Sequence, residues 1–255
     1  MRRIAPIVVL LVALAGCGSD DSSGNAASKQ AIVVSAASSL TAALTSCSKQ
    51  FERANVRLSF AGSDELAAQI RQGVKPDVFA SANTTLPEAL YKEGLVEKPR
   101  VFAANRLVLA VPASGAKVAS IADLEKPGVT IAMGSATVPV GGYTRKVLAK
   151  LPAGESKAIL ANVRSNEPDV GGVVGKVAQG AVDAGFVYVT DVKGADGRLR
   201  AITLPEDLQP QVAYGVAVVK GAKNPEQAKA FVDGLISGDG RKRLDAAGFL
   251  PPPGT

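Results

Sequence analysis

Residues 31–61 read AIVVSAASSLTAALTSCSKQFERANVRLSFA, and this stretch decides the fold class. The apolar run at 32–34 is typical of a buried strand, residues 40–51 carry apolar side chains at helical spacing, and residues 56–60 alternate as a second strand does. A strand, a helix and a second strand in this order form the unit from which parallel sheets are built. The stretch therefore predicts an α/β fold.

The same alternation continues along the chain. The sequence predicts further strands at 77–80, 106–111, 129–133, 184–189 and 213–219. It predicts further helices at 63–72, 87–93, 121–125, 142–151, 169–179, 225–236 and 241–247. Helices that alternate with strands in this way flank mixed, mostly parallel sheets.

Two of the predicted strands resemble each other in length and pattern. Residues 106–111 (RLVLAV) and 213–219 (AYGVAVV) are both strongly strand-like. We expect them to be two crossover strands, by which the chain enters a second lobe near residue 110 and returns near residue 211. This predicts a first lobe of residues 31–110 plus 211–255 and a second lobe of residues 111–210.

The composition excludes several kinds of catalytic and metal-binding site. The chain has 255 residues, no histidine and two cysteines, which excludes His-dependent catalysis, His-containing metal sites and four-cysteine clusters. Apolar residues make up 47% and charged residues 20%, which is ordinary globular usage. The formal charge of +6 comes from 29 Lys and Arg against 23 Asp and Glu. Because the basic residues are scattered without runs, we expect no nucleic-acid partner.

The N-terminus predicts export. A basic start at Arg2 and Arg3 precedes an apolar run at 4–15 that is too short to span a bilayer, so residues 1–16 are predicted to be a signal peptide. Residues 14–17 (LAGC) resemble the lipobox of bacterial lipoproteins, which predicts lipidation of Cys17; ordinary signal cleavage is the alternative. Residues 17–30 lack large apolar side chains, and we expect a flexible tether that anchors an extracytoplasmic protein to the cell membrane. Cys47 is expected to be a small buried residue.

Small or hydroxyl residues stand at four predicted helix starts that follow strands. These are Ser38 with Ser39, Gly62 with Ser63, residues 139–142 and residues 169–172. Unpaired N–H groups and the positive end of the helix dipole favour an anion at such starts, and open α/β sheets place ligands at this edge. The alternative is that the serines only cap their own helices and the glycines only form turns.

Several motifs resemble those of the molybdate-binding proteins of ABC importers. They are residues 36–41 (AASSLT), 60–63 (FAGS), 66–70 (LAAQI), 76–82 (PDVFASA), 138–143 (VPVGGY), 167–170 (EPDV), 185–188 (GFVY) and 214–219 (YGVAVV). The resemblance implies a two-lobed type II periplasmic-binding-protein fold that closes on molybdate or tungstate. It also implies a membrane permease and a separate ATPase as partners, with no cofactor and no enzymatic activity.

The resemblance further implies an oxyanion site made of hydrogen-bond donors. Its members are the hydroxyls and N–H groups of Ser39 and Ser63, the N–H groups of Val140 and Val170, and the phenol of Tyr188, with Ser38 as a neighbour able to supply a further donor. Molybdenum would be bound only as the oxyanion. Donors alone satisfy a fully ionised oxyanion, whereas monoprotonated phosphate needs an acceptor for its proton. Because none of these donors titrates near neutrality, we expect capture to vary little between about pH 6 and 8.

Two residues depart from the expected pattern. Val140 stands where we expect alanine, and its branched side chain could tighten the pocket. Asp64 follows Ser63 where we expect a small polar residue. Pointing outward, Asp64 would stabilise the helix start, but pointing into the cleft it would repel a dianion.

Other functions stay open at this point. A donor-only pocket also suits sulfate, with discrimination left to pocket size. Residues 46–49 and 114–117 match the S-x-x-K motif of serine–lysine hydrolases, although the chain lacks the Lys-Thr-Gly partner motif. Residues 191–197 (DVKGADG) indicate a turn. We predict a monomeric oxyanion receptor and not an enzyme.

Overall fold

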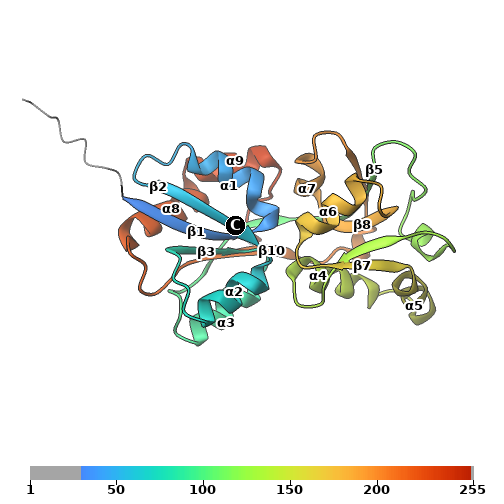
Figure 1. Cartoon of the computed structure of the whole chain (residues 1–255), viewed down its shortest axis with the longest axis horizontal. Coiled ribbons are helices and arrows are strands. Elements are labelled where there is room, and N and C mark those ends of the chain that lie inside the picture. The colour runs from blue at the N-terminus through green and yellow to red at the C-terminus, as the bar shows by residue number, and fades with distance from the viewer. Residues whose placement is uncertain (1–29, 254–255) are drawn as a thin grey trace, which may run out of the picture.

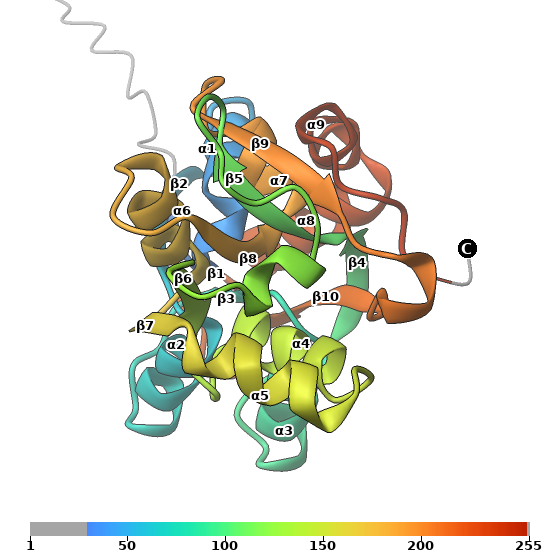
Figure 2. The same ribbon diagram turned by 90° about the vertical axis from the view of Figure 1, so that its right-hand side faces the viewer.

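The chain folds into two lobes that lie side by side along the long axis of the molecule (Figure 1). A computed structural model describes residues 30–253. The predicted signal peptide, Cys17 and the tether up to residue 29 lie outside the described residues. Figure 2, turned by 90°, shows the second lobe in front of the first. This arrangement confirms the predicted two-lobed α/β fold.

The first lobe contains a five-stranded sheet of order β2-β1-β3-β10-β4. Its strands are β1 (Ala31–Ala37), β2 (Asn55–Ala61), β3 (Val78–Ser81), β4 (Arg100–Asn105) and β10 (Val212–Val218). Its helices are η1 (Ser38–Leu40), α1 (Thr41–Ser48), α2 (Ser63–Arg71), α3 (Thr85–Lys92), α8 (Pro225–Ser237) and α9 (Asp239–Ala247). Helices α1 and α9 lie on one side of the sheet and α2 and α3 on the other (Figure 1).

The second lobe contains a five-stranded sheet of order β7-β6-β8-β5-β9. Its strands are β5 (Leu107–Pro112), β6 (Ile131–Gly134), β7 (Val163–Glu167), β8 (Ala184–Tyr188) and β9 (Leu199–Thr203). Its helices are η2 (Ala122–Glu125), α4 (Pro139–Leu148), α5 (Ala153–Ala161), α6 (Val170–Ala178), α7 (Val189–Lys193) and η3 (Glu206–Leu208).

Both sheets follow one plan. In the first, β10 is antiparallel to its neighbours β3 and β4, while β1 pairs in parallel with β2 and β3. In the second, β5 is antiparallel to β8 and β9, while β6 pairs in parallel with β7 and β8. One strand of each sheet therefore opposes the rest, as predicted for mixed, mostly parallel sheets.

The chain crosses between the lobes at two places. Arg106 alone separates β4 in the first sheet from β5 in the second, and the return lies between β9 and β10. The sequence places the first crossing near residue 110, but that residue lies inside β5, which pairs only with strands of the second sheet. The first segment of the first lobe therefore ends at β4, which pairs with β10 at the edge of the first sheet.

The sequence patterns do not indicate six of the elements, namely β4, β7, β9, α5, α7 and η3. The three strands among them all lie at sheet edges, where one side of the strand pairs with no further strand of the sheet and polar residues such as Arg164 and Arg200 are tolerated. Helix α4 begins at Pro139 and not at residue 142, because proline suits the first position of a helix.

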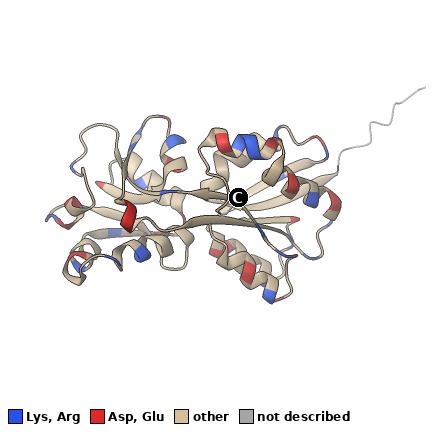
Figure 3. Ribbon diagram, turned by 180° about the vertical axis from the view of Figure 1, so that it is seen from behind, with Lys and Arg blue, Asp and Glu red and all other residues tan. Residues whose placement is uncertain are grey.

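An apolar core runs through both lobes. At their junction the ring of Tyr188 in the second lobe meets the ring of Tyr214 on β10, edge to face, with centroids 5.8 Å apart. Cys47 is buried, as predicted, with its Sγ 3.7 Å from the carbonyl oxygen of Gly240 on α9. Lys and Arg lie among Asp and Glu on both lobes (Figure 3). No helix within residues 30–253 is long and apolar enough to cross a bilayer.

Candidate functional site

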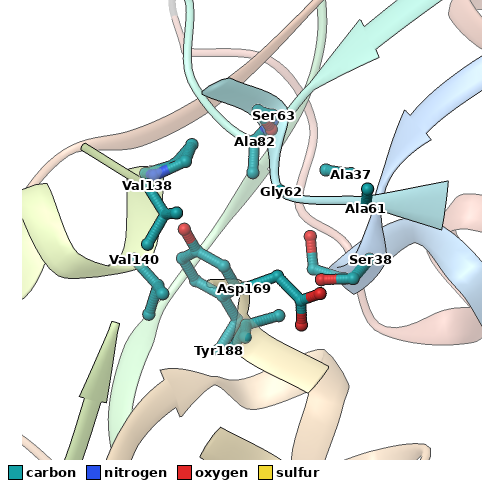
Figure 4. Close-up of a pocket in the computed structure, with 13 residues that line it drawn as sticks. Ala37, Ser38, Ala61, Gly62, Ser63, Ala82, Val138, Val140, Asp169 and Tyr188 are labelled. Atoms are coloured by element: carbon teal, nitrogen blue, oxygen red, sulfur yellow. The ribbon is translucent and has the colours of Figure 1, made fainter. Parts of the chain in front are cut away.

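A small cavity lies where the two lobes meet. From the first lobe it is lined by Ala37, Ser38, Ser39, Ala61, Gly62, Ser63 and Ala82. From the second lobe it is lined by Val138, Pro139, Val140, Asp169, Val170 and Tyr188 (Figure 4). The ends of β1, β2 and β8 and the starts of the helices that follow the strands converge here. The structure thus brings every residue predicted for the oxyanion site to one cavity.

Helix starts surround this cavity. Helices α2, α4 and α6 begin at Ser63, Pro139 and Val170, and η1, which leads into α1, begins at Ser38. The first N–H groups of a helix have no intrahelical acceptor, and its dipole places about half a positive charge at this end. Within residues 30–253, no lysine or arginine lines the cavity. The groups here that favour an anion are therefore the backbone N–H groups at the helix starts.

The hydroxyls of Ser39 and Ser63 each accept a hydrogen bond from within the first lobe. Ser63 is 1% exposed, and its Oγ accepts the Ala82 N–H at 3.1 Å. The Oγ of Ser39 accepts from the Tyr214 hydroxyl at 3.1 Å. Neither η1 nor α2 has a side-chain cap, so the alternative interpretation of these serines as caps is wrong. Each hydroxyl keeps its own hydrogen for a group in the cavity.

Tyr188 ends β8 and is 1% exposed. Its hydroxyl points into the cavity (Figure 4) and has no hydrogen-bond partner in the described part of the chain. Burial raises the pKa of this phenol well above its ordinary value, so the group stays protonated and remains a donor. The ring packs edge to face against Tyr143 at 6.4 Å between centroids, which fixes where the hydroxyl lies.

Val140 and Val170 occupy the first turns of α4 and α6 and are both buried. Their backbone N–H groups belong to the set without intrahelical acceptors. The branched side chain of Val140 lies against Gly134 of β6. A Cβ added at Gly134 would be only 2.6 Å from the Cγ1 of Val140. Glycine at 134 therefore makes room for valine where we expected alanine.

Two acidic residues lie near the cavity. Asp169, which lines it, caps α6 by accepting the Gly172 N–H at 3.0 Å. The sequence places Asp169 at a helix start but does not indicate that it lines the cavity. The preference of aspartate for the N-cap position is the signal that could have identified its role at α6. Asp64 does not line the cavity and is partly buried, with its Oδ1 enclosed beside Gly62 and without a partner in the described chain.

A third acidic residue contacts the backbone of Tyr188. Asp191 on α7 accepts the Tyr188 N–H at 2.8 Å through Oδ2. Burial, with a smaller contribution from the charge of Asp169, raises the pKa of this carboxyl to about 7. Sequence reasoning missed this residue because 191–197 indicates an exposed turn, whereas α7 packs it inside. The site therefore has a buried carboxyl beside it whose pKa lies near neutrality, a neighbour that the expectation of capture with little pH dependence did not include.

The competing hydrolase motifs lie away from the cavity. Lys117 of the second S-x-x-K motif pairs with Asp183 at 2.8 Å, and Ser46 of the first accepts from Arg243 at 3.1 Å. Neither motif contributes a residue to the cavity. Residues 30–253 also hold no cluster of His, Cys, Asp and Glu suited to a metal ion.

Two lobes of one plan, joined by two crossings around a cavity of hydrogen-bond donors, define the class of extracytoplasmic solute-binding proteins. Residues 32–250 match the family of bacterial extracellular solute-binding proteins, and the chain belongs to it. Membership in this family confirms the prediction of a receptor and not an enzyme.

Curated relatives show to which family of solute-binding proteins the chain belongs. The chain is 35% identical over 254 residues to the molybdate-binding protein ModA of Mycobacterium tuberculosis H37Rv, covering 96% of this chain and 95% of the relative. It therefore belongs to the ModA family. It is also 30% identical, with 96% of each chain covered, to YvgL of Bacillus subtilis, a putative ABC transporter substrate-binding lipoprotein.

Two solved structures share the fold. The periplasmic molybdate-binding protein of Azotobacter vinelandii matches with a TM-score of 0.78 at 23% identity, over 87% of this chain and 99% of the other. The sulfate-binding protein SubI of Mycobacterium tuberculosis matches with a TM-score of 0.77 at 17% identity, over 87% of each chain. These matches confirm the predicted periplasmic-binding-protein fold.

Proposed function

We propose that this protein captures molybdate or tungstate, as the fully deprotonated oxyanion, in the cavity between its lobes. The observation that carries the proposal is the Tyr188 hydroxyl, which is buried at the cavity without a partner in the described chain. An unsatisfied buried donor costs about 1–3 kcal/mol, and a ligand oxygen would recover that cost. The relatives of the ModA family support molybdate as the ligand.

In this proposal the donors divide between the lobes. Ser39 and Ser63 would each offer a hydroxyl and an N–H from the first lobe, with Ser38 as a further donor. Val140 and Val170 would offer N–H groups, and Tyr188 its phenol, from the second lobe. Because donors come from both sides, the ligand would hold the lobes together. Neutral donors also avoid an unpaired buried cation in the empty protein.

The donor set favours a ligand without protons. Each hydrogen bond to a charged oxygen contributes about 1.5–3 kcal/mol, and a protonated oxygen placed against one of these donors would form a weaker bond. Monoprotonated phosphate is therefore disfavoured. Sulfate is the second candidate, because the sulfate-binding protein SubI shares the fold and sulfate is equally free of protons. Discrimination between the two must then depend on the size of the cavity.

Thermal unfolding with four anions tests the ligand. We expect molybdate or tungstate at a thousandfold excess over the dissociation constant to stabilise the protein by about 4 kcal/mol, or about 8–16 °C in Tm. Phosphate should give no shift. The absence of a shift with molybdate and tungstate would refute the proposal, and an equal shift with sulfate would move the function to sulfate capture.

We further propose that the receptor acts as a monomer and delivers its oxyanion to a membrane permease driven by a separate ATPase. The family supports the transport role. Deletion of the receptor should abolish uptake of radiolabelled molybdate at low concentration, and the wild-type chain should restore it. A variant with both Ser39→Ala and Ser63→Ala should not restore uptake, and full restoration by this variant would contradict the proposed site.

The N-terminus is proposed to anchor the receptor. Residues 1–16 would be removed as a signal peptide, and Cys17 would carry lipid at the end of a tether of residues 17–30. The lipoprotein relative YvgL supports this proposal. Labelling cells with a radioactive fatty acid should mark the wild-type chain and leave Cys17→Ser unmarked, with Cys47→Ser as the control that keeps the label.

A further inference from the structure

We infer that Tyr214 and Asn105 are positioning residues that hold the Ser39 hydroxyl as a hydrogen-bond donor toward the ligand. The inference rests on the proposed capture of an oxyanion. It extends the site to two residues that do not line the cavity. Both belong to the first lobe, and Asn105 directly precedes Arg106, where the chain crosses to the second lobe.

A continuous chain of hydrogen bonds leads from this crossing to Ser39. The Oδ1 of Asn105 accepts the Arg106 N–H at 2.9 Å. The Nδ2 of Asn105 donates to the Tyr214 hydroxyl at 3.4 Å and to the Thr190 Oγ1 of the second lobe at 2.9 Å. The Tyr214 hydroxyl in turn donates to the Oγ of Ser39 at 3.1 Å.

Chemistry fixes the direction of each of these bonds. A backbone N–H can only donate, so Oδ1 of Asn105 must face Arg106, and Nδ2 is left for Tyr214. Since Nδ2 also can only donate, the phenol oxygen accepts from it, and Ser39 Oγ is the acceptor among the described residues that is left for the phenol hydrogen. The Ser39 oxygen is an acceptor in that bond. Its own hydrogen is then free to point into the cavity.

The surroundings hold this arrangement away from solvent. Tyr214 is 0% exposed and Asn105 is 4% exposed. The Tyr214 ring is held edge to face by Phe102 at 6.2 Å and Phe249 at 5.3 Å between centroids. Burial also raises the pKa of the Tyr214 phenol well above its ordinary value, so the hydroxyl keeps the hydrogen that it donates.

Ser63 shows the same arrangement by another route. Its Oγ accepts a backbone N–H, that of Ala82, so its hydrogen is likewise left for the cavity. In both serines the hydroxyl oxygen therefore accepts a hydrogen bond from the first lobe, which leaves the hydroxyl hydrogen to be donated to the ligand. Only for Ser39 does that bond come from a side chain, which makes its orientation open to mutation.

A double-mutant cycle on the purified protein tests the inference. The dissociation constant for molybdate is measured by calorimetry for the wild type, Tyr214→Phe, Ser39→Ala and the double variant. Tyr214→Phe should weaken binding about tenfold in the wild-type background. In the Ser39→Ala background it should weaken binding by less than about twofold, because the hydroxyl that Tyr214 orients is gone.

Equal losses in both backgrounds would overturn the inference, since Tyr214 would then act through packing alone. Thermal unfolding without ligand reports whether each variant folds. If Tyr214→Phe does not fold, Asn105→Ala removes the donor to Tyr214 and enters the same cycle. The matched control is Tyr143→Phe, which deletes a buried hydroxyl that bonds the backbone of Ala213 and not Ser39. Its effect should be the same in both backgrounds.

The ligand and the inference can fail separately. If the wild type binds sulfate and not molybdate, the proposed ligand is wrong, and the cycle is run with sulfate. The inference then stands or falls on the same coupling between Tyr214 and Ser39. If the wild type binds none of molybdate, tungstate, sulfate and phosphate, the proposed function and the inference both fail.

Discussion

The carbonyl oxygen of Pro168 in the second lobe lies against Gly62 of the first lobe, so close that a Cβ at Gly62 would be 2.5 Å from it. The backbone of Gly62 is ordinary, with φ −60° and ψ 137°, so any residue could adopt it. Glycine is therefore required here by the approach of the two lobes and not by backbone conformation. Gly62 lines the cavity, which places this contact at the ligand site.

Gly62→Ala should weaken ligand binding without unfolding either lobe. The added methyl group meets a backbone atom of the opposite lobe, and overpacking of this kind costs about 1–3 kcal/mol, or about 5- to 150-fold in dissociation constant. Calorimetry with molybdate measures the loss, while Tm without ligand should change little because the lobes can separate. Gly142→Ala on α4 is the control, since a Cβ there meets nothing within 4 Å. Normal affinity in Gly62→Ala would show that binding does not need this approach.

Tyr188→Phe should change stability and binding in opposite directions. Removing a buried hydroxyl without a partner should stabilise the empty protein by about 1 kcal/mol, or about 2–4 °C in Tm. The loss of a donor to a charged oxygen should weaken molybdate binding by about 10- to 150-fold. Thermal unfolding and calorimetry on the same samples check both effects.

The control for this prediction is Tyr91→Phe. Tyr91 lies on α3 with 42% of its surface exposed, and loss of its hydroxyl should alter neither quantity. A Tyr188→Phe variant that is less stable without ligand would mean that the hydroxyl already has a partner in the empty protein.

Part of this site could be predicted from residue types. Ser39 and Ser63 follow strands and begin helices, which is the pattern of an anion site, and both line the cavity. Val140 and Val170 could not be predicted from residue type, because any residue other than proline can donate through its backbone N–H. Those two were predicted only through the resemblance to a known family.

Other features of the site had no signal in the sequence. Tyr214 bonds Ser39 from 175 positions away, and no local pattern reports a contact of that range. Asp191 belongs to a stretch with the composition of a turn, and only the packing of α7 shows that it is buried. The strand β4 is separated from β5 by Arg106 alone, and so short a break between two strands gives no signal for the crossing at that residue.

Cys47 should be almost unreactive in the folded protein. Burial raises the pKa of its thiol to about 11, so about one molecule in a thousand carries the reactive thiolate at pH 8. With Cys17→Ser as the background, Cys47 is the sole thiol. Alkylation by iodoacetamide at pH 8, followed by mass spectrometry, should be slow in the native protein and fast in guanidinium. Rapid native labelling would mean that α9 opens away from α1.

Asp191 should make stability depend on pH in a direction opposite to that of the ion-paired carboxylates. Its folded pKa of about 7 lies above the ordinary value of 3.8, so the folded state holds a proton that the unfolded state has lost. Stability from this group is therefore present below about pH 4 and is lost as the pH rises toward 7. Asp191→Asn keeps an acceptor for the Tyr188 N–H and cannot ionise. The Tm of this variant, minus that of the wild type, should increase from pH 4 to pH 7 and then stay constant.

The same carboxyl should make capture depend on pH. A dianion in the cavity raises the pKa of Asp191 further, because Asp191 lies directly behind Tyr188, so binding near pH 7 takes up a proton. Molybdate affinity should therefore fall several-fold as the pH rises from 6 to 8. Calorimetry in two buffers of different ionisation enthalpy measures the proton uptake, which Asp191→Asn should abolish. Proton uptake that persists in Asp191→Asn would contradict the assignment of the titrating group to Asp191.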